Sequence, residues 1–307
     1  MKIQNLMKTN NFLRKGAVIT AIATLGIAFS CQENEAPLAE EASYIAEESV
    51  TDMYFEDTDD IAGLAIVSDE GTNTGGRVGE GPRTITINDP RCTCENLTVT
   101  ISFTPNSNAE TPVGDIVIDF GDGCEDGQGN IRKGKILIHF VGKRFMPESI
   151  ITTTFDGYSI NGITLEGTRT LTNISGSTEV SPKFKVQLAD GQATWPDGTV
   201  ATREHCFERE WIRALNPLMD QLLVNQCGDA SVAASGTNRR GVGYTMEIVE
   251  ELVYKRGCPI AVEGVKKFTN VSTGKSITVD YGDGTCDNII TISVDGTTRS
   301  VNVRRQG

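Results

Sequence analysis

The sequence predicts an all-β protein: a long antiparallel meander of hairpins, built as an extended sheet or a sandwich, with at most one or two short helices. Three observations support this prediction. Apolar and polar residues alternate in many short segments, which gives each segment one apolar face. Asn-Gly, Asp-Gly and Glu-Gly pairs punctuate the chain after about residue 82. Seven cysteines follow Cys31, as expected of an exported chain that keeps disulfides.

The first thirty residues have the composition of an export signal. They contain four basic residues and no acid, and an apolar run from Gly16 to Phe29 precedes Ser30 and Cys31. The run is short for a membrane-spanning helix. The cysteine directly after a small residue resembles a bacterial lipoprotein signal, which implies that Cys31 becomes the acylated N-terminus of the mature chain. An ordinary secretory signal with an incidental cysteine is the alternative.

The segment after Cys31 is strongly acidic. Residues 32–60 contain eleven acids and no Lys or Arg. Because like charges repel and core-forming residues are few, we expect residues 31–81 to form an acidic flexible tether, continued by a glycine-rich stretch. A short helix within it is the alternative, because small and apolar residues between Ala42 and Met53 follow helical spacing.

Charge also bears on the partners of the chain. Without residues 1–30 it keeps 24 basic and 41 acidic residues, a formal net charge of −17, which excludes a nucleic-acid-binding footprint. An acylated Cys31 implies a lipid bilayer as one partner, from which the tether holds the globular part at a distance. The acidic stretch Gln32–Glu35 resembles the export signals of Bacteroidetes surface lipoproteins, which implies an outer-membrane anchor facing the cell surface.

Residues 82–307 are predicted to form one β-rich domain. Asn161-Gly162 and Asp295-Gly296 each suit a two-residue hairpin turn, because both positions of such a turn need positive φ angles. Charged residues alternate outward along Thr168–Leu171 and Lys183–Val186, so at least one sheet face is expected to be solvated. The expected strands are Thr84–Asn88, Leu97–Thr104, Asp115–Phe120, Gly134–Val141, Ile151–Ile160, Ile163–Asn173, Lys183–Ala189, Thr199–His205, Gly243–Tyr254, Lys275–Tyr281, Ile289–Val294 and Arg299–Arg304.

One segment departs from this alternation. Apolar residues from Trp211 to Leu222 follow helical spacing. Pro217 suits the first turn of a helix, so we expect one short helix that begins near this residue and packs in the core.

Two similar turns follow strand-like segments, at Ile118–Asp126 and Val279–Asp287. Each contains Gly-Asp-Gly with a cysteine just beyond it. We expect the aspartates to accept hydrogen bonds from nearby backbone amides. An irregular calcium site formed by Asp122, Asp126 and Asn130 is the alternative, and no other cofactor is expected.

The cysteines have no zinc-site spacing, and His139 and His205 lie in different predicted strands. One thiol must stay unpaired among the seven cysteines of the domain. The expected disulfides join Cys258 with Cys286, Cys206 with Cys227, and Cys124 with either Cys92 or Cys94.

The sequence contains no complete catalytic signature. Thr273–Ser276 resembles only the end of a phosphate loop, and no Gly-x-Ser-x-Gly is present. We therefore expect a non-enzymatic surface module that binds an unknown glycan or protein or has a structural role. A cell-surface polysaccharide hydrolase and a calcium-stabilised adhesin are the alternatives. Trp195 and Tyr158 are candidates for exposed aromatics on a binding face, and packing within hairpins is their alternative role.

The motifs resemble those of a known group. Ile118–Cys124, Ile151–Phe155, Glu166–Thr170 and Asp280–Asp287 resemble segments of Bacteroidetes cell-surface lipoproteins of uncharacterised function, and the resemblance covers most of residues 90–307. It implies a shared extended β fold and a lipid anchor. It carries no active site to transfer.

Overall fold

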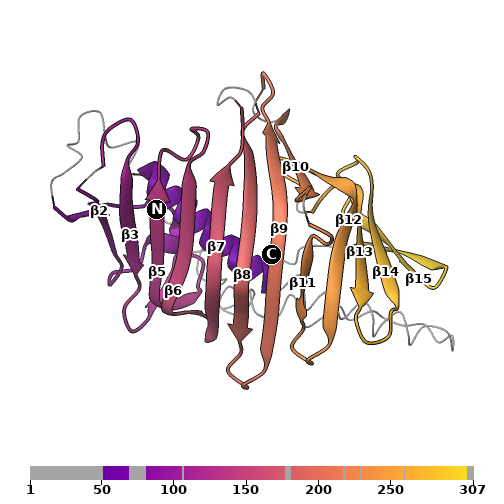
Figure 1. The fold of residues 1–307 in the computed structure, drawn as a ribbon. Coiled ribbons are helices and arrows are strands. Elements are labelled where there is room, and N and C mark those ends of the chain that lie inside the picture. Colours follow the sequence, from indigo (N-terminus) through magenta and orange to yellow (C-terminus); the bar gives the residue numbers. More distant parts are fainter. Residues whose placement is uncertain are drawn as a thin grey trace, which may run out of the picture.

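The computed structural model describes residues 51–68, 81–105, 107–176, 181–216, 219–228, 230–258 and 260–302. They form one antiparallel sheet of sixteen strands, and a helix at residues 51–68 crosses one face of it behind β5 to β9 (Figure 1). The predicted all-β meander of hairpins is therefore confirmed. The predictions for the signal peptide, for Cys31 and for residues 31–50 lie outside the described residues.

The described elements are as follows in chain order. They are the helix 51–68, β1 (Arg83–Thr84), the 3-10 helix η1 (Pro90–Cys92), β2 (Thr98–Phe103), β3 (Val113–Asp119), β4 (Cys124–Glu125), β5 (Ile131–Val141), β6 (Ile150–Ile160), β7 (Ile163–Asn173), β8 (Lys183–Thr194), β9 (Val200–Ile212), β10 (Gln221–Gln226), β11 (Ala234–Thr237), β12 (Gly243–Lys255), β13 (Glu263–Asn270), β14 (Ser276–Asp283), β15 (Ile289–Val294) and β16 (Thr297–Asn302).

Most strands pair with their neighbours in the sequence, so tight turns join them. Asn161 and Gly162 have φ angles of 53° and 80°, and Asp295 and Gly296 have 47° and 81°. Both hairpin predictions are therefore confirmed. There are two exceptions. β3 pairs directly with β5, and the short β4 pairs with β5 alone. Between β9 and β12, β10 and β11 share one position in the sheet and each pairs with both long strands.

The predicted helix near Pro217 is wrong, because residues 221–226 form the strand β10. Leu222 pairs with Trp211 of β9 and with Tyr254 of β12, so cross-strand packing prevails over the helical spacing. Leu215 and Met219, which belong to the predicted buried face of that helix, are exposed. Tertiary contacts therefore decide the conformation of this segment.

Glycines allow the sheet to bend. The register shifts between β5 and β6 at Gly134, which has a φ of 71°, and a Cβ there would lie 2.3 Å from the carbonyl oxygen of Gly157. Another shift follows between β7 and β8, where a Cβ on Gly167 would lie 2.8 Å from the Cα of Gly191. Such bulges increase the local twist, and Figure 1 shows the twist of the sheet from β2 to β15.

The helix 51–68 belongs to the hydrophobic core. Phe55, Ile61, Ala62, Ala65 and Ile66 are at most 4% exposed and join the apolar residues of β2 to β9. The prediction of a flexible tether is therefore wrong for residues 51–68, whose apolar residues form one buried helix face. Among the described residues, no helix has the length and apolar content that a membrane crossing requires.

Candidate functional site

The two faces of the sheet differ sharply. We call the face that packs against the helix 51–68 the covered face, and the opposite one the open face. Apolar residues such as Ile116, Ile136 and Val186 alternate onto the covered face and are fully buried. Arginines from β5, β7 and β9 alternate onto the same face. The helix therefore covers charge as well as apolar surface.

We call these arginines and their helix partners the arginine network. The arginine side chains are between 0% and 20% exposed. The members are Arg132 of β5, Arg169 of β7, Arg203 and Arg209 of β9, and the helix residues Asp52, Glu56, Asp57 and Asp59.

Arg132 joins the helix to two other parts of the chain. Its Nη1 donates to Asp57 Oδ2 and to the Tyr158 hydroxyl, each at 2.6 Å. Its Nε donates to Asp126 Oδ2 at 2.9 Å. Because both carboxylates are charged, these hydrogen bonds are among the stronger ones in the molecule.

Arg169, Arg203 and Arg209 hold the first half of the described helix. Arg169 lies 3.0 Å from Glu56 Oε1 through Nη2 and 3.1 Å from Asp59 Oδ1 through Nε. Arg209 also pairs with Glu56. Arg203 Nη2 lies 3.0 Å from a carboxylate oxygen of Asp52. Isolated buried charges would be costly, so each arginine depends on its partner.

The pKa shifts in the network follow from burial and charge. Burial, followed by the nearby Glu56 charge, raises the pKa of Asp52 to about 6. Burial alone would also raise the pKa of Glu56, but Arg209 and Arg169 hold it below its ordinary value. Burial, with Arg169 and Arg203, lowers the pKa of His205 well below 6.5, so the ring is neutral and accepts a hydrogen bond from Arg203 Nε at 3.2 Å. The network binds the helix to the sheet.

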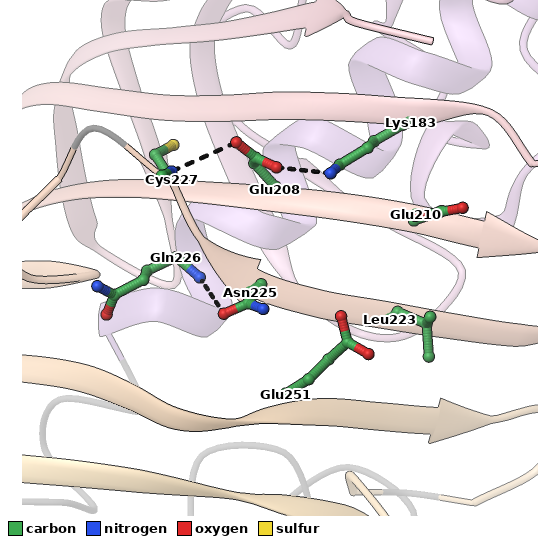
Figure 2. Close-up of a pocket in the computed structure, with 9 residues that line it drawn as sticks. Lys183, Glu208, Glu210, Leu223, Asn225, Gln226, Cys227 and Glu251 are labelled. Carbon is green, nitrogen blue, oxygen red and sulfur yellow. Dashed lines mark hydrogen bonds and ion pairs between the residues drawn. The ribbon is translucent and has the colours of Figure 1, made fainter. Parts of the chain in front are cut away.

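The open face carries a pocket over β8, β9, β10 and β12, with a volume of about 340 Å³. Figure 2 shows its polar side chains, with the helix on the far side of the sheet. Cross-strand register assembles it: Glu208 and Glu210 of β9 pair with Asn225 and Leu223 of β10. Since Val224 pairs with Leu252, Asn225 lies beside Glu251 on β12.

The pocket has more negative than positive charge. Lys183 Nζ lies 2.7 Å from Glu208 Oε2, and this hydrogen bond lowers the pKa of Glu208 and raises that of Lys183. Glu210 and Glu251 line the same hollow, and the described part of the chain offers neither of them a hydrogen bond or ion pair. The pocket therefore offers two carboxylates to a ligand.

The predicted exposed aromatics are buried. Tyr158 is fully buried and hydrogen-bonded to Arg132, and Trp195 is 8% exposed, with the Arg239 guanidinium 4.4 Å from its ring centroid. Both aromatic side chains therefore pack in the interior, against residues outside their own hairpins. The histidines do not meet, because His139 is on the open face beside Asp115 whereas His205 is buried on the covered face.

The calcium alternative fails on geometry. Asp126 is buried, and its carboxylate accepts hydrogen bonds from Arg132 and from backbone amides including that of Asn130. Asn130 Oδ1 accepts from Asn161, while Asp122 is exposed. The described residues contain no cluster of His, Cys, Asp or Glu that could hold a metal ion. Asp122, Asp126 and Asn130 therefore do not come together as a calcium site.

The hydrogen bonds expected of the aspartates are present in both Gly-Asp-Gly copies, but Gly282 and Asp283 of the second copy still belong to the strand β14. Asp119 Oδ1 accepts a hydrogen bond from the Gly121 amide and Asp280 Oδ1 accepts one from the Gly282 amide, both at 2.8 Å.

The disulfide predictions are confirmed. Burial raises the pKa of the unpaired, buried Cys92 to about 11, so this thiol is inert near neutral pH. The disulfides are Cys94–Cys124, Cys206–Cys227 and Cys258–Cys286.

Sequence reasoning missed both the arginine network and the pocket. Arg169 was expected to point outward, yet it lies on the covered face with a side chain that is 0% exposed. Its position in the alternation of β7, two residues before the buried Leu171, was the available signal.

No family model, curated protein or solved structure matches this chain.

Proposed function

We propose that the protein is an exported lipoprotein, acylated at Cys31, whose sheet is a non-enzymatic binding module at the bacterial cell surface. The observation that supports this function best is the asymmetry of the sheet. The helix 51–68 covers one face over β5 to β9 (Figure 1), whereas the open face remains polar and carries a pocket. Three disulfides support an exported location.

The open face has the chemistry of a polar binding surface. Hydroxyl groups pair across its strands at Thr202–Thr237, Thr269–Ser276 and Ser293–Thr298, with separations of 2.9 to 3.1 Å. Each hydroxyl can both donate and accept a hydrogen bond. A surface of this kind suits a glycan or protein partner.

The position of the helix also supports the proposal. Cys31 precedes the helix by twenty residues in the sequence, and the helix docks on the covered face. An acylated Cys31 therefore connects to the body on the covered side. This leaves the open face free to point away from the membrane.

The polysaccharide hydrolase remains the second candidate, because the pocket contains three glutamates. A glycosidase needs one carboxyl group that stays protonated to act as the acid. The hydrogen bond from Lys183 lowers the pKa of Glu208, which favours its ionised form. A binding role therefore fits the pocket better.

Mass spectrometry of the protein purified from bacterial membranes tests the anchor. The mature chain is expected to begin at Cys31 and to carry acyl groups, and Cys31→Ser is expected to move the protein out of the membrane fraction. Protease treatment of intact cells is expected to cleave the wild-type protein. A mature N-terminus at another residue, or membrane association that survives Cys31→Ser, would contradict the proposal.

A further inference from the structure

We propose that the pocket on the open face binds an alkylammonium group, the chemistry of a lysine side chain. The inference deepens the proposed function, because it names a ligand class for the open face and depends on that face being available. It is carried by a hollow of about 340 Å³ in which Glu210 and Glu251 have no partner among the described residues. This volume lies at the lower end of the range for small-ligand pockets.

The charges in the pocket favour a cation. Glu208, Glu210 and Glu251 contribute three negative charges, and Lys183 contributes one positive charge. Lys183 is hydrogen-bonded to Glu208 at 2.7 Å and also attracts Glu210 and Glu251, so one cation faces three carboxylates and the pocket keeps an excess of negative charge. Anionic ligands would meet an excess of like charge, whereas an ammonium group can donate hydrogen bonds to both carboxylates.

The shape of the pocket favours an alkyl stem behind the charge. Leu223 of β10 lies between β9 and β12, which carry the two unpartnered glutamates. Figure 2 shows the Leu223 side chain near Glu251 and Glu210. A short methylene chain can cover Leu223 while its ammonium group reaches the carboxylates, as lysine side chains do at protein surfaces. The Asn225 carboxamide beside them offers a further oxygen acceptor.

The same lining disfavours other ligands. None of the described residues that line the pocket is aromatic, so they offer a sugar ring no stacking surface. No metal-binding cluster occurs among the described residues, which disfavours a divalent cation. A primary ammonium ion needs only converging oxygen acceptors, and these are present.

Calorimetric titration of the purified mature protein tests the inference. The probes are cadaverine and a short lysine-containing peptide, and the control ligand is the same peptide with an acetylated, neutral lysine. We expect the charged probes to bind and the acetylated peptide to bind at least tenfold more weakly. Raised ionic strength should weaken binding, because the pocket is open to solvent.

Substitutions in the pocket sharpen the test. Glu210→Gln and Glu251→Gln should each weaken binding about fivefold, the scale of a partly exposed ion pair, and the double variant should weaken it more. Glu204→Gln is the matched control, because Glu204 is exposed on β9 and does not line the pocket. Urea denaturation should show that all four variants are as stable as the wild-type protein.

The outcomes separate the inference from the proposed function. If the lysine peptide binds more tightly than cadaverine, a protein partner supplies the ammonium group. If cadaverine binds more tightly, a free diamine supplies it. Absent binding of both probes, or binding unchanged in the double variant, would overturn the inference. Neither glutamate takes part in acylation, so these results are independent of the test at Cys31.

Discussion

The covered and open faces belong to the same strands, yet they use charge in different ways. On the covered face, Arg169 is 0% exposed and pairs with Glu56 and Asp59 of the helix. On the open face, Lys135 pairs with Asp119 at 3.3 Å while both side chains stay between 31% and 41% exposed. The comparison indicates that an ion pair contributes more to stability where the helix excludes water from it.

Burial explains this difference. The attraction between two charges grows as water is removed, but so does the cost of leaving either charge alone. Solvent screens the exposed pair and hydrates either partner after the other is lost. The two faces should therefore respond very differently to the loss of one cation.

The largest expected effect is that of Arg169→Met. The substitution leaves Glu56 and Asp59 of the helix with fewer counter-charges, and breaking such a buried pair costs about 3–5 kcal/mol. Urea denaturation should show this loss in the free energy of unfolding. A loss below about 1 kcal/mol would mean that the helix contributes little to stability through its charges.

The second effect concerns the disulfide beside the pocket. Cys206 of β9 and Cys227, directly after β10, are 21 residues apart in the sequence. Closing a loop of this size contributes about 3 kcal/mol in the chain-entropy model. The double variant Cys206→Ser and Cys227→Ser should lose roughly this amount in urea denaturation. An unchanged free energy of unfolding would show that pairing of β10 with both neighbours already fixes the pocket.

The third effect is a pH dependence on the covered face. Burial raises the pKa of Asp52 from 3.8 to about 6, so the folded protein holds a proton that the unfolded chain releases. The stability from this group is complete below about pH 4 and is lost as the pH rises through 6. The shift corresponds to at most about 3 kcal/mol, and less because the Asp52 side chain is 24% exposed.

Asp52→Asn removes the titrating carboxyl group, so comparing the variant with the wild-type protein isolates the contribution of Asp52. The wild-type protein should lose stability relative to the variant when urea denaturation is repeated from pH 4 to pH 7. The pKa of Glu56 is lowered, so the stability that Glu56 contributes is lost as the pH falls. Glu56 is present in both proteins, so its contribution does not separate them. A difference between the two proteins that stays constant with pH would refute the assignment to Asp52.

Local signals in the sequence predicted much of the fold. Ile163–Asn173 and Ile289–Val294 were expected as strands with the bounds that β7 and β15 have, because alternation and hairpin turns are local properties. The helix 51–68 was missed because its counter-charges are remote: Glu56 meets Arg169 at a sequence separation of 113 and Arg209 at 153. Local composition therefore showed acids without the arginines that neutralise them.

The pocket was beyond sequence reasoning for a related reason. Its glutamates belong to β9 and β12, and they converge only because β10 lies between these strands in one register. The sequence favoured a helix in place of β10, so this register could not be foreseen. The cysteine flanking β10 was paired correctly, but a disulfide does not fix the strand beside it.

The smallest expected effect is that of Lys135→Met, the counterpart of Arg169→Met on the open face. Lys135 and Asp119 face each other across β5 and β3, and both remain in contact with water. Exposed pairs of this kind contribute about 0–1 kcal/mol, so urea denaturation should show a loss well below that of Arg169→Met. Added salt should reduce the small loss further, because it screens the exposed pair and leaves the buried one almost unchanged. Equal losses for the two variants would mean that the helix does not shield the covered face from water, and the contrast between the two faces would then fail.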